Sequence, residues 1–221
     1  MQLKVILYFI LFIPILCHAQ SEKEELTMWD HEDYISVTVS PSAIFNTFPG
    51  IQVGVERKIN DYLLELEFAY ISSELFGAVI PRTGYRNKLS LKYILHNDPD
   101  PNKPRSSLNF IAFHRFTNTI ITEDHFLGSF FRQFTYDRGQ RVFGLAAGIS
   151  SHTRVFNRFD FEIGFAGGPG LIRVQNNDEE IPANSFADAS DDRFAIYRDD
   201  GVYFYPILSF QLKLKYLIHH R

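Results

Sequence analysis

The chain has 221 residues, with 22 Lys and Arg against 26 Asp and Glu, and a formal net charge of −4. This length suits one domain, and mild acidity without a basic stripe argues against nucleic-acid partners. The single cysteine, Cys17, lies near the N-terminus, so the rest of the chain can form no disulfide, cysteine-based zinc site or cysteine nucleophile.

The first nineteen residues have the layout of a secretory signal. Lys4 precedes an apolar run over residues 5–16, and the small Ala19 precedes the polar Gln20. The apolar run is too short for a membrane-spanning helix, which needs roughly 20 residues. We therefore predict a cleaved signal at 1–19, with a buried N-terminal helix as the alternative. Cleavage removes one basic residue, Lys4, and leaves a net charge of −5.

Residues 20–33 are mostly polar and predict a short leader before the first strand. From residue 34 onward, apolar and polar side chains alternate with a period of two, which indicates strands. The alternation predicts four strands in the first part, at residues 34–44, from 51 to the tight connection at 58–61, 62–71 and 85–96. It predicts four more at 108–115, 141–153, 159–174 and 202–217.

The connections alternate in length. Those at 58–61, 97–107 and 154–158 are short, and the other connections after the first are longer, the last two reaching about 25 residues. An even number of strands, with short turns at one end and long loops at the other, is typical of outer-membrane barrels whose termini are periplasmic. We predict an all-β fold, an eight-stranded antiparallel up-and-down transmembrane β-barrel over residues 34–218.

The segments "GIQVGVERKINDYLLELEFAYI", "RVFGLAAGISSHT", "FDFEIGFAGGPG" and "PILSFQLKLKYLI" resemble the small eight-stranded outer-membrane barrels of Gram-negative bacteria, the OmpX and OmpA-barrel type. The resemblance is one of pattern and covers essentially all of residues 34–218. It implies a place in the cell outer membrane more than an activity. Members of the group serve in envelope structure, adhesion, narrow permeation and occasionally lipid chemistry.

Volume indicates which face of the barrel points outward. Rows such as Phe159, Phe161 and Phe165 would overfill an eight-stranded lumen. The charged face carries small residues, among them Gly148 and Gly168, which we expect to leave room for long charged side chains. We therefore predict a charged lumen and an apolar exterior; the reverse arrangement would be a soluble periplasmic carrier resembling lipocalins.

Charges inside a barrel need partners, because an unpaired buried ion is costly. We predict pairing of strands three and four with Glu65 opposite Lys92, and of strands seven and eight with Glu162 opposite Lys213. The proposed lumen charge network comprises Glu65, Glu67, Lys88, Lys92, Asp160, Glu162, Lys213 and Lys215. It would be either a salt-bridged plug or gate, or a purely structural polar core.

The sequence offers few candidates for other chemistry. Ser150 and His152 share a strand face, as a nucleophile and base could, but their order and periplasmic position argue against catalysis. The last connection is rich in acid, with Asp178, Glu179, Glu180, Asp188, Asp191, Asp192, Asp199 and Asp200. Neither these nor Glu123, Asp124 and His125 show the ligand spacing of a calcium loop.

We therefore predict no catalytic residue, metal or cofactor. The expected function is a non-enzymatic barrel that presents long acidic loops outside the cell. The expected partners are outer-membrane lipid, and lipopolysaccharide or another surface partner through the loops. A lipid-modifying outer-membrane enzyme is the rival hypothesis.

Overall fold

The structure is a computed structural model that describes residues 33–41, 50–73, 81–95, 104–126, 131–156, 158–177, 186–187 and 200–220. The signal proposed at 1–19 and the leader up to residue 32 lie outside the described residues. Within these ranges, no helix has the length and apolar character needed to cross a membrane.

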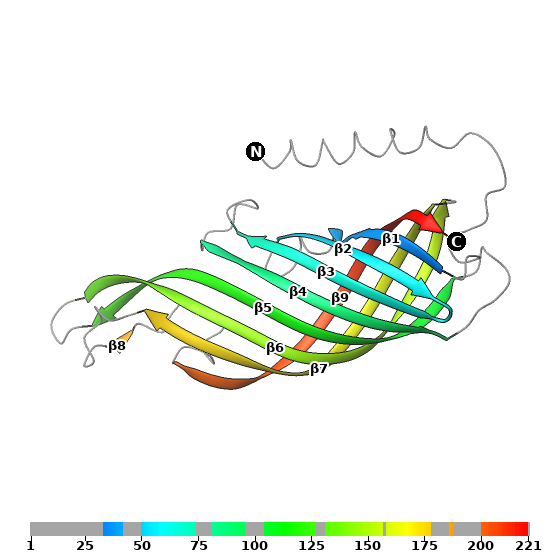
Figure 1. The fold of residues 1–221 in the computed structure, drawn as a ribbon. Coiled ribbons are helices and arrows are strands. Elements are labelled where there is room, and N and C mark those ends of the chain that lie inside the picture. Colours follow the sequence, from blue (N-terminus) through cyan, green and yellow to red (C-terminus); the bar gives the residue numbers. More distant parts are fainter. Residues whose placement is uncertain are drawn as a thin grey trace, which may run out of the picture.

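Eight antiparallel strands form one closed ring (Figure 1). They are β1 (Asp33–Val39), β2 (Gly50–Ile59), β3 (Tyr62–Ser72), β4 (Arg82–Ile94), β5 (Arg105–Phe126), β6 (Phe131–Phe156), β7 (Phe159–Asn177) and β9 (Gly201–His220). Each strand pairs with its neighbour in the chain, and β1 pairs with β9. The two-residue β8 (Phe186–Ala187) adds to β5. The predicted all-β, eight-stranded up-and-down barrel is confirmed.

The barrel has two unlike ends. At the first, here called the turn end, β1 begins, β9 finishes, and Asn60 and Asp61 form a two-residue turn between Ile59 and Tyr62. Asn60 has φ 53°, in the left-handed region that Asn tolerates better than most residues. β1 is short, so it pairs with β9 only between Leu214 and His220. Hydrogen bonding between β1 and β9 therefore closes the wall near the turn end.

The opposite, far end is dominated by the hairpin of β5 and β6, which reaches beyond the other strands (Figure 1). The predicted connection of about 25 residues is wrong, because pairing continues up to Phe126 opposite Phe131. Thr, Ile, Phe and Tyr favour this pairing, and the hydroxyls of Thr122 and Thr135 lie 3.0 Å apart across the two strands. β1, in contrast, ends at Val39 instead of the predicted residue 44, and residues 42–49 lie outside the described part.

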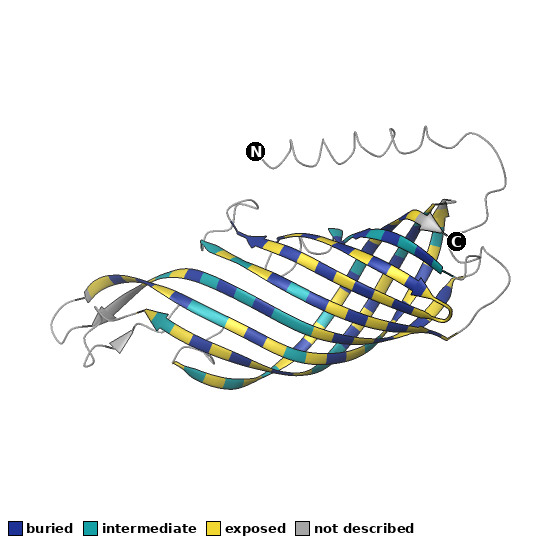
Figure 2. Cartoon of the chain, viewed as in Figure 1, coloured by how far each residue is buried: buried dark blue, intermediate teal, exposed yellow. Residues whose placement is uncertain are grey.

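Burial alternates residue by residue along the strands (Figure 2). The inward side chains form layers along the barrel axis. A small apolar cap at the turn end contains Tyr34, Leu63, Ile94 and Leu217. Charged residues follow, and beyond them lie two apolar clusters, one of Ile111, Ala146, Ala166 and Ile207 and one of Val142, Ile172 and Val174.

The inward glycines also have a role within the wall of the barrel. A Cβ atom on Gly148 would lie 2.0 Å from the carbonyl oxygen of Phe165, and one on Gly168 would lie 2.1 Å from that of Leu145. These glycines let adjacent backbones of β6 and β7 approach closely as the wall bends. Their missing side chains therefore allow close packing within the wall, and their role in leaving room for the charged side chains stays a prediction.

Candidate functional site: the charged lumen

Five strands contribute charged side chains to the middle of the lumen. The observed ion-pair network consists of four carboxylates and four ammonium groups: Glu56, Glu65, Glu67, Lys88, Lys92, Glu162, Lys213 and Lys215. All eight residues are buried. Equal numbers of the two signs keep the network neutral, which is the condition under which buried charges are tolerable.

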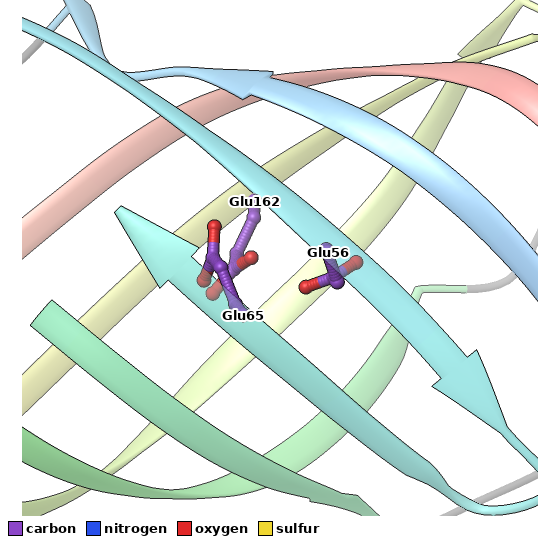
Figure 3. Close-up of side chains that lie close together, drawn as sticks. All are labelled: Glu56, Glu65 and Glu162. Carbon is purple, nitrogen blue, oxygen red and sulfur yellow. The ribbon is translucent and has the colours of Figure 1, made fainter. Parts of the chain in front are cut away.

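Lys92 occupies the centre of this network. Its Nζ atom lies 2.9 Å from a carboxylate oxygen of Glu56 and 2.7 Å from oxygens of Glu65 and Glu162. Figure 3 shows these three carboxylates converging from different strands. One oxygen of each lies within 4.8 Å of the others, a spacing that could also suit a metal ion. The ammonium of Lys92 supplies the positive charge that a cation would otherwise bring.

The other lysines link the carboxylates into one continuous chain. Lys215 Nζ lies 2.7 Å from Glu56 and 2.8 Å from Glu162, so it bridges the same two groups as Lys92. Lys213 Nζ lies 2.5 Å from Glu65 and 3.1 Å from Glu67. Lys88 completes the chain at 2.8 Å from Glu67. Because most members have two or more partners, removing one ion disturbs several others.

The strand registers agree with the sequence in one pair of strands and differ in the other. β7 and β9 pair as predicted, with Glu162 opposite Lys213 and the buried Asp160 opposite Lys215. The predicted pairing of Glu65 with Lys92 is wrong in register, because Glu65 lies opposite Ser90. The shift is two residues, which keeps each side chain on its face, and Lys92 still reaches Glu65 diagonally.

Sequence reasoning missed Glu56 as a network member. It lies on the inward face of β2, and its partners come from β4 and β9, 36 and 159 residues along the chain. The only sequence signal was the position of Glu56 on the polar face of the strand, next to the apolar Val55.

A group of neutral polar side chains borders the network. Ser107 Oγ lies 2.9 Å from Nε2 of His152 and 3.0 Å from Ser150 Oγ. His152 Nδ1 lies 3.8 Å from Glu162 and 3.5 Å from the ammonium of Lys215. The order serine, histidine, carboxylate resembles a nucleophile with its base and orienting acid. However, Ser107, His152 and Glu162 are at most 2% exposed, so a substrate could reach them only if the lumen opened.

Tyrosines and other aromatics mark two levels on the exterior. Near the turn end, Tyr62 packs against Tyr93 at 5.3 Å and Phe159 against Tyr216 at 5.0 Å between ring centroids. Farther along, Tyr85 packs against Phe116 at 5.7 Å. Between these levels the outward residues are mostly aliphatic or Phe, and many are more than half exposed, including Leu66, Phe110, Leu145, Phe165, Phe204 and Leu208.

The remaining sequence candidates contribute little to the described site. Residues 178–199 of the acidic connection lie outside the described residues, apart from the backbone pairing of β8. The exposed Asp200 accepts a hydrogen bond of 2.7 Å from the backbone NH of Asn176. Glu123, Asp124 and His125 lie in β5 and not in a connection, and their side chains are outside the described part.

Comparison with known proteins assigns no family. No protein-family model and no curated protein matches the chain. A solved structure, a major outer membrane protein from Thermus thermophilus, aligns with a TM-score of 0.47 and 11% sequence identity, covering 85% of this chain and 100% of that chain. At this level of similarity the alignment assigns neither a family nor an activity.

Proposed function

We propose that the chain is exported with a signal cleaved after residue 19 and inserts as a barrel into the cell outer membrane, as the OmpX and OmpA-barrel type does. The observation that carries this proposal is the apolar exterior between two aromatic levels. Soluble monomers rarely expose continuous apolar patches beyond a few hundred Å². A soluble carrier also needs an apolar lumen, whereas here the charged groups face inward.

The separation of the aromatic levels fits a membrane. Tyr62 and Tyr70 on β3, and their partners Tyr93 and Tyr85 on β4, are eight residues apart. Eight steps of a strand span about 27 Å, which becomes about 20 Å across the membrane at a tilt near 40°. Outer-membrane barrels have an apolar band about 25 Å tall, flanked by aromatic girdles.

The filling of the lumen by side chains supports a closed barrel and not an open pore. An eight-stranded barrel is just filled by its own side chains, and here ion pairs and apolar layers occupy successive levels. We propose that the predicted network residues act, together with Glu56, as a structural plug. We also propose that the protein is non-enzymatic and uses the β5–β6 hairpin and the acidic connection, both outside the cell, to contact lipopolysaccharide or another surface partner.

Membrane fractionation tests this function directly. The mature protein should begin near Gln20, remain with outer membranes after a carbonate wash, and migrate differently on gels before and after boiling. Recovery in the soluble periplasm with a single gel mobility would refute the proposal and favour a soluble carrier.

A lipid-modifying enzyme is the second candidate, favoured only by the contact between Ser107 and His152. Deleting the gene should leave lipid A unchanged if the barrel is non-enzymatic. A lipid A change that the wild type restores and the Ser107→Ala and His152→Ala variants do not would establish the enzyme instead.

A further inference from the structure

Two exposed arginines lie directly opposite each other on the outer face of the wall, toward the far end. Arg141 on β6 and Arg173 on β7 are register partners, and both side chains are exposed. Their chain neighbours Val142, Ile172 and Val174 are buried in the lumen, so the arginines point outward. Like charges at such positions destabilise a sheet. A group with several negatively charged oxygens between them would convert the repulsion into attraction.

The charges of these two arginines are not neutralised within the described part of the chain. The guanidinium of Arg141 lies over the ring of Phe116, 5.6 Å from its centre. Among the described residues, neither Arg141 nor Arg173 forms an ion pair. Arg57, an outward arginine near the turn end, differs because it pairs with Asp33 at 3.0 Å. The arginine near the turn end therefore has a carboxylate partner, and the two toward the far end do not.

The tilt of the strands places both arginines beyond the farther aromatic level. The row of directly opposite residues that starts at Tyr62 reaches Phe165 on β7, six residues past Phe159 at the turn end. Such rows therefore climb toward the far end. With a tilt near 40° and strands about 4.8 Å apart, each step to the next strand rises by about 3 Å. Arg141 and Arg173 share a row with Tyr85 and lie about 6 and 9 Å beyond it.

An uncharged surface adjoins the arginines on the side of the turn end. The next outward residues, Phe143 on β6 and Leu171 on β7, are opposite each other and are 56% and 55% exposed. Beyond them the outward residues of both strands carry no charge as far as Ile149 and Phe165. Two cations at the border of an apolar wall match a lipid, whose charged headgroup and apolar chains are joined in the same order.

We propose that Arg141 and Arg173 bind the phosphate group of a lipid headgroup, with the acyl chains of that lipid along Phe143 and Leu171. Arginine suits this role because its planar guanidinium donates paired hydrogen bonds to phosphate oxygens. A lipid is favoured over a soluble phosphate ion because it uses the arginines and the apolar surface together. The inference rests on the proposed function, since only a barrel inserted with its far end outward meets lipids of the outer leaflet at this position.

The test uses the full mature chain, folded in an uncharged detergent and titrated with phosphatidic acid while its unfolding temperature is measured. Diacylglycerol with the same acyl chains is the control lipid, because it lacks only the phosphate. Phosphatidic acid should raise the unfolding temperature of the wild type saturably, and diacylglycerol should not. The double variant Arg141→Gln with Arg173→Gln should need at least tenfold more phosphatidic acid for half of the rise. Arg57→Gln is the matched control, because it removes an exposed outward arginine near the turn end, and it should respond as the wild type does.

Several outcomes would overturn the lipid site. Equal responses to phosphatidic acid and diacylglycerol would show that the phosphate is not recognised, and an equal loss in Arg57→Gln would show a general effect of surface charge. Inorganic phosphate that protects at the same concentration as phosphatidic acid would identify a soluble ion as the ligand. If the double variant does not fold, Arg173→Gln alone replaces it in the same titration.

The titration is independent of the test of the proposed function. Recovery of the protein in the soluble periplasm would refute membrane insertion and leave the detergent result unchanged. A wild type that fractionates with outer membranes but does not distinguish the two lipids would refute the lipid site alone.

Discussion

Charged side chains are arranged differently at two levels of the lumen. In the ion-pair network each ammonium lies within 3.1 Å of at least one carboxylate, and Lys92 contacts three. Nearer the far end, the buried Arg86 on β4 and Arg115 on β5 are direct register partners, so two cations face each other on adjacent strands.

This difference indicates that the two levels of the barrel have different roles. The neutral network lies in the half where β1 and β9 close the wall, between apolar layers, so it suits a structural plug. Arg86 and Arg115 lie nearer the far end and are buried as well. Substitutions can therefore separate the two levels, because loss of a cation should harm the ion-pair network more than it harms the level where two arginines face each other.

The largest effect should follow from Lys92→Met. The substitution leaves three carboxylates close together with one buried positive charge fewer, and breaking a buried ion pair in this way costs about 3–5 kcal/mol. Unfolding by guanidinium in lipid or detergent, followed by the gel mobility of the folded form, measures the loss.

The double variant Glu65→Gln with Lys92→Met is the control for charge balance. It restores neutrality and leaves Lys213 paired with Glu67, so it should be more stable than Lys92→Met alone. Simple additivity of the two substitutions would mean that the network is not a coupled structure.

Both charged levels of the lumen should lie inside a wall that faces lipid. Leu66 is 61% exposed, midway between Tyr62 and Tyr70 on β3. Leu66→Arg should cost about 2–4 kcal/mol, as arginine does on the lipid face near the bilayer centre. Thr122→Arg, on an exposed site of the projecting hairpin, is the control and should assemble normally. Equal assembly of the two variants would contradict the outward orientation.

The strands of the wall were largely predictable because each has an apolar exterior and a polar or charged interior. For β3 the predicted range, 62–71, differs from Tyr62–Ser72 by one residue. The pattern fails in the β5–β6 hairpin. There Phe134 and Tyr136 are buried while Ile120 is exposed, so hydropathy no longer separates the two faces and pairing between the strands maintains the structure.

The candidate site was predictable in composition and less so in its contacts. Alternation shows which residues of a strand face inward and so excludes a register slip of one residue. A slip of two residues leaves each side chain on the same face and is not excluded. The choice between Lys92 and Ser90 opposite Glu65 therefore depends on the geometry of the connection between β3 and β4. Glu56 was missed because its partners lie across the lumen, where neither hairpin neighbours nor sequence spacing provide a signal.

Permeation tests whether the plug is continuous. Purified wild-type barrel in lipid vesicles should pass small sugars poorly and show at most rare, small ion conductances, because side chains fill an eight-stranded lumen. Lys92→Met should raise ion conductance if water enters among the unpaired carboxylates. Vesicle swelling in sugar solutions and single-channel recording measure these effects, and rapid sugar flux through the wild type would exclude a closed lumen.

The smallest effect should come from Arg86, and it should differ from that of its inward neighbour on β4. Lys88→Gln breaks the 2.8 Å ion pair with Glu67, and loss of a hydrogen bond to a charged group costs about 1.5–3 kcal/mol. Arg86→Gln can keep a hydrogen bond to Gln52. It removes the repulsion with Arg115, its register partner, as well as the attraction of Glu67, so its free energy of unfolding should fall less than that of Lys88→Gln. Parallel unfolding curves of the two variants measure the contrast. Because each substitution replaces one buried cation by glutamine on the same strand, differences in volume and strand propensity largely cancel. If Arg86→Gln proved as damaging as Lys88→Gln, the facing pair of Arg86 and Arg115 would be as firmly bound into the structure as the ion-pair network.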